Sequence, residues 1–386
     1  MQQSIPTIPH SASGLDLHLS ALAAVDAGSA PFLSCFLDAR QGEAACRDFL
    51  TDRYLELADG IPAAQRALLD EAMVMADAAF AHHWPSGVQT VAVFARPGCD
   101  ERFLQVLPLV DAIPAQVDWY RLPRLLPLME AAATRARFTM LLGRQGAMYV
   151  VDVTDGRAET RAWASPRRTG PAKGQGPDPQ TIALRRALLE QSALPLVVAA
   201  AAADVDDLVG WLPSRSRARF VERVEVPDYL DFNRAVRFVI EDFQDRRRLE
   251  EQLEVSRLIR ASRDHGMAVL GPLACTEALR GGAVETLVLA RGVSFPRVRY
   301  CQRCGAQDAW ASGAVPCVEC GEATPMPLDF ANEIAYLAKR RRADIVFSDA
   351  EELRYLGGVG CLLPQSAEAS AMPLPTPRRH GLDLVA

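Results

Sequence analysis

A chain of 386 residues with 49% hydrophobic and 23% charged residues is globular and too long for one ordinary core, which predicts two or three domains. Its formal net charge of −6 at pH 7 excludes a protein that attracts nucleic acid through overall charge, so any RNA contact requires a local basic patch. Four basic runs are candidates, although each one alone is typical of a solvated helix face: Arg167, Arg168 and Lys173 together, Arg215–Arg223, Arg246–Arg248 and Lys339–Arg342.

Residues 1–125 predict an N-terminal α/β domain. The sequence PFLSCFLD over 31–38 is typical of a short buried strand, and apolar residues then recur at helical spacing up to Gly60. A second helix is predicted from Pro62, since proline suits the first turn of a helix. Two strands are predicted after it, over Val88–Phe94 and Phe103–Val110. Nothing in this domain has the pattern of a catalytic site.

Residues 135–228 predict a middle α/β domain. Phe138–Leu142 and Ala147–Val153 flank a glycine-containing turn, which indicates a hairpin, and Glu159–Trp163 supplies a third strand. The loop 166–179 follows, rich in glycine and proline and carrying three cations.

The loop leads into a predicted helix over Thr181–Gln191. Four apolar residues at helical spacing are expected to face inward: Ile182, Leu184, Leu188 and Leu189. A buried strand over Leu196–Ala202, a further helix and a strand over Arg219–Val226 complete the predicted domain.

Residues 229–364 predict a third domain, a small α/β/α sandwich. It opens with a long helix from Phe232 to about Ser262. The remaining predicted elements alternate between helix and strand: Ala274–Arg280, Val284–Ala290, Phe330–Arg341, Ala343–Phe347 and, after the glycine turn 357–360, Cys361–Leu363. The tail 365–386 has many prolines and few large apolar residues, which is typical of a disordered segment.

Two CxxCG sequences, at Cys301–Gly305 and Cys317–Gly321, form the strongest motif in the chain. Each such knuckle turns the backbone so that two thiolates face one centre, and two knuckles complete a tetrahedral four-sulfur site for a metal such as zinc. Since all four positions are protein ligands, we expect a structural zinc ribbon over 299–323, not a catalytic centre. Iron in the same cage and four free cysteines are the alternatives.

The remaining cysteines and the apolar runs bear on localisation. The nine cysteines are odd in number, and those outside the knuckles show no pairing pattern, which favours a reducing cytoplasm. Met1–Gly14 lacks the pattern of a signal peptide. The longest apolar run, Leu194–Ala203, has about half the length that a bilayer requires, so no membrane partner is expected.

The third domain resembles the C-terminal domain of the archaeal and eukaryotic peptide-chain release factors and of Pelota. The resemblance is carried by Glu277–Leu289 (EALRGGAVETLVL), by the two knuckles and by the ending Leu356–Leu363 (LGGVGCLL). The middle domain, with its strands, glycine loop, helix and following strand, is similar to the family's central domain, which has a ribonuclease-H-like fold. Because the chain begins with a LSCFLD strand and not with the codon-reading domain, it looks most like the bacterial branch of this superfamily.

The resemblance implies a ribosome-associated protein that acts on peptidyl-tRNA, with the ribosome and tRNA as partners and a translational GTPase as a further candidate. Family release factors place a Gly-Gly-Gln tip in the central loop, where a glutamine backbone amide helps to position the attacking water. The matching loop here has Gln175 between Gly174 and Gly176 and lacks the double glycine before it. Gln180, which follows Pro179, is the alternative counterpart.

Two classes of function therefore follow from the sequence. The first is a peptidyl-tRNA hydrolase or ribosome-rescue factor that acts through loop 166–179, with Arg167, Arg168 and Lys173 contacting RNA. The second is a non-catalytic RNA or ribosome binder similar to Pelota. A solvated linker between a strand and a helix is the plain structural interpretation of the same loop.

Overall fold

The structure is a computed structural model. It describes residues 14–25, 30–61, 63–80, 87–98, 102–134, 137–154, 157–164, 179–190, 194–263, 266–296, 298–301, 304, 307–309, 316–321 and 326–364. The expected disordered tail 365–386 and residues 166–178 of the predicted loop lie outside these ranges. Within the described helices, none combines the length and the apolar character that a membrane crossing needs.

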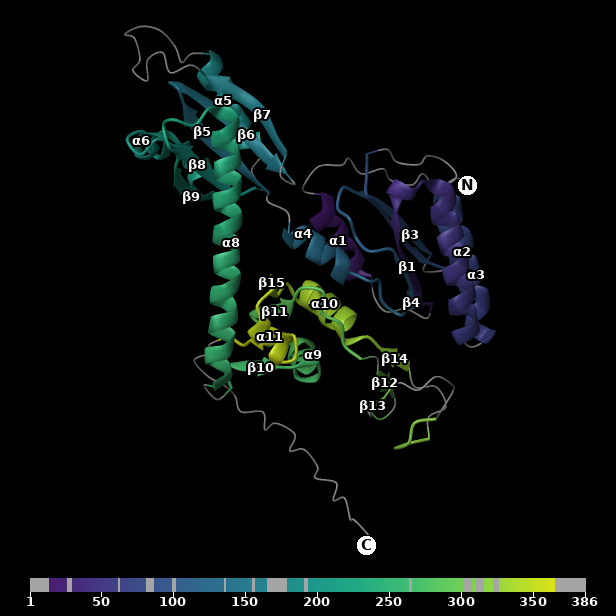
Figure 1. The fold of residues 1–386 in the computed structure, drawn as a ribbon. Coiled ribbons are helices and arrows are strands. Elements are labelled where there is room, and N and C mark those ends of the chain that lie inside the picture. Colours follow the sequence, from purple (N-terminus) through teal and green to yellow (C-terminus); the bar gives the residue numbers. More distant parts are fainter. Residues whose placement is uncertain are drawn as a thin grey trace.

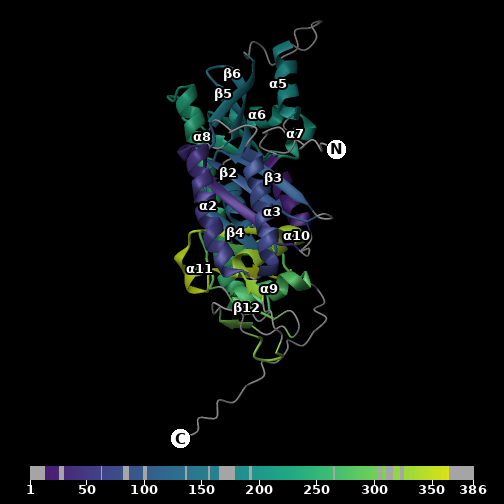
Figure 2. The same cartoon turned by 90° about the vertical axis from the view of Figure 1, so that its right-hand side faces the viewer.

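The N-terminal sheet has the strand order β3-β2-β1-β4, and all its neighbouring strands are antiparallel. Strand β1 alternates its side chains between two faces, because successive side chains of a strand point in opposite directions. Leu33, Cys35 and Leu37 pack with helices α2 and α3, whereas Phe36 packs on the other face. Figures 1 and 2 show α2 and α3 side by side. The elements are β1 (Phe32–Asp38), η1 (Ala39–Gln41), α2 (Glu43–Gly60), α3 (Ala63–Phe80), β2 (Thr90–Arg96), β3 (Phe103–Leu109) and β4 (Gln116–Tyr120).

Two helices that the sequence analysis did not predict, α1 (Gly14–Ala24) and α4 (Leu126–Thr134), pack on the second face of this sheet. Leu15, Leu19 and Leu22 of α1 are buried there, while Leu17 is exposed. The helix therefore buries one stripe, as an amphipathic helix does.

The middle sheet has the order β7-β6-β5-β8-β9. Strands β5, β6 and β7 form an antiparallel meander. Strand β8 pairs in parallel with β5, and β9 pairs in parallel with β8. The predicted hairpin turn is confirmed, with Gln145 at φ +48° and Gly146 at φ +70° between β5 and β6. The elements are β5 (Arg137–Arg144), β6 (Ala147–Thr154), β7 (Arg157–Ala164), α5 (Pro179–Glu190), β8 (Leu196–Ala200), α6 (Val205–Trp211), α7 (Ser214–Arg217) and β9 (Phe220–Glu225).

One long helix, α8 (Phe232–Arg263), connects the middle sheet to the C-terminal sheet, as Figure 1 shows. Val236, Val239 and Phe243 in its first half pack on the middle sheet. Val255 and Leu258 in its second half pack on the C-terminal sheet. A single helix therefore takes part in two separate cores.

The C-terminal sheet has the order β10-β16-β11-β15, with β11 and β15 parallel and the other pairs antiparallel. Helices α8 and α11 cover one face, and α9 and α10 cover the other. Most of the predicted elements are confirmed within a few residues. The bounds are β10 (Ala268–Leu270), α9 (Pro272–Gly281), β11 (Thr286–Ala290), α10 (Phe330–Arg341), β15 (Asp344–Ser348), α11 (Glu351–Tyr355) and β16 (Val359–Leu362).

The N-terminal and C-terminal sheets share one continuous apolar core. It runs from Phe36 and Phe94 of the N-terminal sheet through α1 and α4 to Ile334 of α10 and Leu287 of β11. Helix α10 is consequently buried on most of its circumference, between its own sheet and the helices of the N-terminal region. Figure 1 shows α10 lying directly beneath α1 and α4.

Gly360 of β16 provides the first testable prediction, because the strand passes directly under α8. A Cβ at this position would lie 2.5 Å from Cδ2 and 2.9 Å from Cδ1 of Leu258. Gly360→Ala is expected to lower the free energy of unfolding by about 1–3 kcal/mol, as overpacked core substitutions do. Urea denaturation measures this free energy of unfolding. Gly281→Ala is the control, because a Cβ at position 281 would have no atom within 4 Å. Equal stability of the two variants would contradict the close packing of α8 on β16.

Candidate functional site

The four knuckle cysteines lie beside a small three-stranded sheet inserted between β11 and α10. Its order is β13-β12-β14, from β12 (Val298–Tyr300), β13 (Gln307–Ala309) and β14 (Met326–Leu328). Cys301 follows β12 directly. In the second knuckle the N–H of Gly321 donates to the carbonyl of Cys317 at 2.8 Å, with Gly321 at φ +72°. That positive φ explains the glycine after the second Cys pair, because other residues rarely adopt it.

The sulfur atoms form a compact cluster. Cys301 Sγ lies 3.5 Å from Cys320 Sγ, and Cys304 Sγ lies 3.6 Å from Cys317 Sγ. All four sulfur atoms lie within 4.8 Å of one another. Thiolates that surround a tetrahedral zinc at about 2.3 Å would be about 3.8 Å apart. The spacing therefore fits a four-coordinate metal, and the four cysteines could hold a metal ion.

The environment of the cluster suits a structural role better than a catalytic one. Cys301 and Cys317 are buried and Cys304 is exposed. Four sulfur ligands fill a tetrahedral shell and leave no position for a water or substrate. Elsewhere in the described part of the chain, no other group of three or more His, Cys, Asp or Glu side chains is arranged to hold a metal.

The second predicted site, loop 166–179, is described only at its end. Gly174, Gln175 and Gly176, together with Arg167, Arg168 and Lys173, lie outside the described residues. Pro179 begins α5, and Gln180 is exposed in the first turn of that helix. Figures 1 and 2 place α5 and the cysteine sheet at opposite ends of the molecule. Helix α5 is therefore remote from the cysteine cluster.

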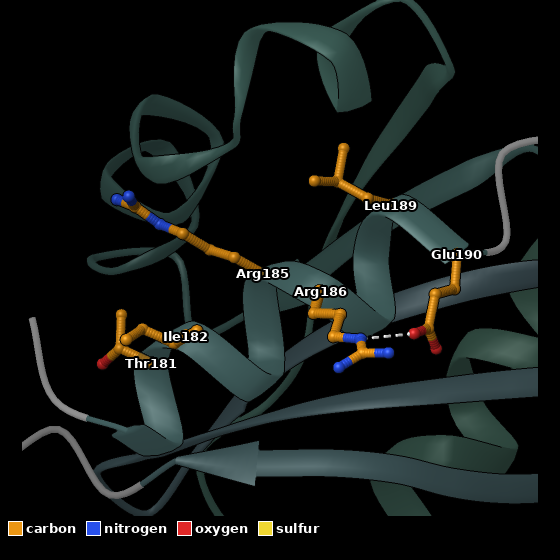
Figure 3. Close-up of a pocket in the computed structure, with 6 residues that line it drawn as sticks. All are labelled: Thr181, Ile182, Arg185, Arg186, Leu189 and Glu190. Atoms are coloured by element: carbon orange, nitrogen blue, oxygen red, sulfur yellow. Dashed lines mark hydrogen bonds and ion pairs between the residues drawn. The ribbon is translucent and has the colours of Figure 1, made fainter.

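Helix α5 corrects one prediction. Leu184 and Leu188 are fully buried as expected, but Ile182 is 51% exposed and Leu189 is 42% exposed. These two side chains line a surface hollow of 450 Å³ together with Thr181, Arg185, Arg186 and Glu190 (Figure 3). The reason is that only one narrow stripe of α5 packs against the middle sheet, and helical spacing alone does not show how wide the buried stripe is.

The cations of α5 have partners on the protein. Figure 3 shows the guanidinium of Arg186 reaching Glu190, and its Nε lies 2.7 Å from the carboxylate. Arg185 lies over the ring of Trp211, 5.2 Å from its centroid. The hollow is therefore rimmed by cations that are already oriented.

A buried polar network joins α10 to the end of β4, and the sequence analysis missed it. Glu333 is 2% exposed, and its Oε1 accepts hydrogen bonds from Arg121 Nη2 at 2.5 Å and from Tyr120 Oη at 2.7 Å. Beside it, Arg124 Nη1 donates to Asp329 Oδ2 at 2.9 Å. An acidic residue in the first turn of a helix is ordinarily a surface residue that complements the helix dipole, so Glu333 carries no sequence signal of burial.

The same network extends along α10. The amide N–H of Leu125 donates to Asn332 Oδ1 at 3.1 Å, and the hydroxyl of Tyr336 donates to the carbonyl of Val25 at 2.7 Å. Burial, and then the Glu333 carboxylate, raise the pKa of the Tyr120 phenol, which keeps the hydroxyl protonated as a donor at neutral pH. These contacts are structural, because each of them connects the N-terminal region to α10.

No family model matches the chain, and no curated protein matches it in sequence. Solved structures do match at low similarity. The chain is similar to the archaeal translation termination factor aRF1, at 14% identity over 92% of this chain and 98% of that chain, with a TM-score of 0.27. It is also similar to archaeal Pelota in a model bound to the ribosome with ABCE1, at 14% identity over 92% and 94%, with a TM-score of 0.37.

A third match covers the C-terminal part alone. The C-terminal domain of a peptide chain release factor from Methanosarcina mazei is 23% identical over 35% of this chain and 96% of that chain, with a TM-score of 0.27. Translation termination factors and Pelota are therefore among the solved structures that are similar to this chain.

Proposed function

We propose that this protein is a ribosome-associated, release-factor-like factor that acts on peptidyl-tRNA, by hydrolysis or in ribosome rescue. One observation carries the proposal. In the C-terminal domain, the sequence GAVE at 282–285 leads into strand β11, a four-cysteine insertion precedes α10, and a glycine turn at 357–358 leads into β16. That is the order of elements that the resemblance to release-factor C-terminal domains implies.

The proposal includes three domains, over 1–125, 135–228 and 229–364, and a cytoplasmic location. A ribonuclease-H-like middle domain is supported by the order β7-β6-β5-β8-β9, in which a meander of three strands is extended by two parallel strands. Membership of the bacterial branch is supported by the N-terminal sheet built around the LSCFLD strand β1.

In this proposal, loop 166–179 reaches the peptidyl-transferase centre. Gly174 and Gly176 give the tip its backbone freedom, and the amide of Gln175 positions the water that attacks the ester bond. Arg167, Arg168 and Lys173 bind tRNA phosphates. The ribosome and tRNA are the partners, and a translational GTPase is the proposed means of delivery.

We propose zinc as the metal held by Cys301, Cys304, Cys317 and Cys320, with iron as the alternative. The metal would supply structural coordination only, since the ligand set is complete. Its role is to fix the β13-β12-β14 sheet next to the start of α10.

A second candidate function is favoured by the loop sequence itself. The residue before Gly174 is Lys173, so the double glycine that precedes the glutamine in release factors is missing. Without it the protein would occupy the ribosome without hydrolysis, in the manner of Pelota.

Release of labelled peptide from stalled ribosome complexes tests the function. We expect Gly174→Ala to reduce release about a hundredfold, since a small misplacement of the catalytic backbone has an effect of that size. Gln175→Ala should reduce it less than about tenfold, because the backbone amide remains. Gly281→Ala, which has open space around its Cβ, serves as the control.

Sedimentation with ribosomes separates the two candidate functions. Binding without release would assign the protein to the non-catalytic class. No sedimentation with ribosomes would refute both.

A further inference from the structure

Two basic runs that lie far apart in the sequence meet in one hollow of the structure. Arg247 of α8 and Lys339, Arg340 and Arg342 at the end of α10 line a cavity of 930 Å³. Helices α1 and α4 and strand β15 form the remaining walls. Each run alone is typical of a solvated helix face, but together they place four cations around one space.

The basic residues of α8 and α10 lie together because both helices pack next to strand β15 of the C-terminal sheet. Helix α8 packs against β15, and α10 ends immediately before β15 begins. Arg342 stands in the left-handed region at φ +59° and closes α10, so the chain turns sharply and presents the last residues of the helix beside α8. The position of Arg247 relative to Lys339 is therefore fixed by two packed helices and does not depend on a loop.

The cations are oriented by the protein. Arg340 Nη1 donates to the hydroxyl of Tyr336 at 3.0 Å. Arg247 and Lys339 also have interaction partners within the protein. A guanidinium has five N–H donors and an ammonium has three, so a single hydrogen bond within the protein does not use all of them. One carboxylate, that of Asp344, also lines the cavity, so cations outnumber it by four to one.

Two kinds of polyanion could bind these cations, an acidic peptide or RNA, and the residues that line the cavity favour RNA. A peptide partner obtains most of its affinity from apolar anchors that enter pockets. Three of the four large apolar residues of the lining are almost completely buried: Leu19 is 1% exposed, Phe347 is 2% and Met129 is 5%, while Ile345 is half-buried. They give an acidic peptide little apolar surface on which to anchor, whereas RNA binding is dominated by phosphate contacts and requires no apolar anchor. Three of the four cations are arginines, which pair with phosphates in a bidentate manner.

We propose that this hollow, the α8–α10 groove of Arg247, Lys339, Arg340 and Arg342, is a binding site for the phosphate backbone of RNA. It adds to the proposed function a second RNA contact, separate in the sequence from loop 166–179, and it rests on that function for its ribosomal setting. The net charge of −6 gives the chain no general attraction to RNA, so binding requires a local group of cations such as this one.

The test is binding of a fluorescent single-stranded oligouridylate to the full-length protein, followed by anisotropy over a range of salt concentrations. The groove variant carries Arg247→Gln, Lys339→Gln and Arg342→Asn, where asparagine is chosen because it tolerates the left-handed region. Arg340 is kept, because its partner Tyr336 takes part in the contact with α1. The control carries Arg237→Gln, Arg248→Gln and Arg260→Gln, three exposed residues of α8 outside the groove, and it loses the same charge.

We expect the groove variant to bind roughly a hundredfold more weakly at about 0.1 M salt, and the slope of log K against log salt to fall by about 2, since each phosphate contact contributes about 0.7. The control should change affinity less than about threefold. Equal losses in both variants, or no RNA binding by the wild type, would overturn the proposal. Polyglutamate that displaces RNA at equal charge concentration would overturn it in favour of an acidic protein partner.

The outcome is independent of the peptide-release and ribosome assays. RNA binding through the groove by a protein that does not sediment with ribosomes would sustain this site and refute the proposed function. A protein that sediments with ribosomes but does not bind the oligouridylate would refute the groove site and sustain the proposed function.

Discussion

Replacing Cys317 with serine is expected to remove the bound metal and to loosen the β13-β12-β14 sheet. The variant leaves three thiolates, and binding energy and folding energy are shared at a structural metal site of this kind. The three strands pair only with one another, and apart from the metal they are held by the packing of Val298 and Leu328 on the core shared by the two larger sheets. Elemental analysis of the purified protein should fall from about one equivalent of metal per chain to less than about half.

Hydrogen exchange shows how far the loosening extends. We expect the amides of β12 and β14 to exchange faster in Cys317→Ser, while those of β11 keep their protection because β11 is central in a different sheet. Val318→Ser is the matched control, since Val318 lies inside the same knuckle but is 72% exposed and provides no ligand. A serine variant with full metal content would remove Cys317 from the ligand set.

Replacing Glu333 with glutamine is expected to lower the free energy of unfolding by about 3 kcal/mol. The carboxylate is buried and accepts from both Arg121 and Tyr120, so the neutral amide leaves the Arg121 guanidinium without its counter-charge in a site of low polarity. Urea denaturation followed by tryptophan fluorescence measures the change. Trp119 lies next to this network in the sequence and reports on the same region.

Glu352→Gln is the control for this prediction. Glu352 is exposed on α11, where loss of a charge should change stability by less than about 0.5 kcal/mol. The pair Arg121→Met with Glu333→Leu should be more stable than Glu333→Gln alone, since replacing both ions by apolar groups removes the unpaired charge. If Glu333→Gln is as stable as the control, the network contributes nothing to the joining of α10 and β4.

The sequence predicts well those elements whose apolar pattern is regular and long. Strand β1, helices α2, α8 and α10, and the hairpin of β5 and β6 are found within a few residues of their predicted places. Strand β1 is buried on both faces, and the helices bury residues at helical spacing, which in α8 form two separate stretches; that burial determines the pattern. The cysteine cluster is predicted in full, because its spacing encodes the local geometry of the knuckles and needs no long-range information.

The elements that were missed depend on contacts that a local pattern does not contain. In α1 the leucines at 15, 17 and 19 alternate as they would in a strand, and only the packing of α1 on α4 and α10 makes the segment a helix. Strand β4 is half-buried along its whole length, so it has no strong alternation. Glu333 and the α8–α10 groove combine residues that are about 90 to 210 positions apart, and no spacing rule connects such residues.

Helix α8 sets both the distance and the rotational phase between the middle sheet and the C-terminal sheet. Its 32 residues span about 48 Å, and each residue advances the helix by about 1.5 Å while rotating it by about 100°. One residue added between Phe243 and Val255 would therefore turn the middle sheet and α5 by more than a quarter of a circle relative to the cysteine sheet. A helix α8 longer by about seven residues, close to two full turns, would restore the relative rotation of the two sheets and move the middle sheet away by roughly 10 Å. The length of α8 in helical turns therefore determines how far apart the two sheets lie.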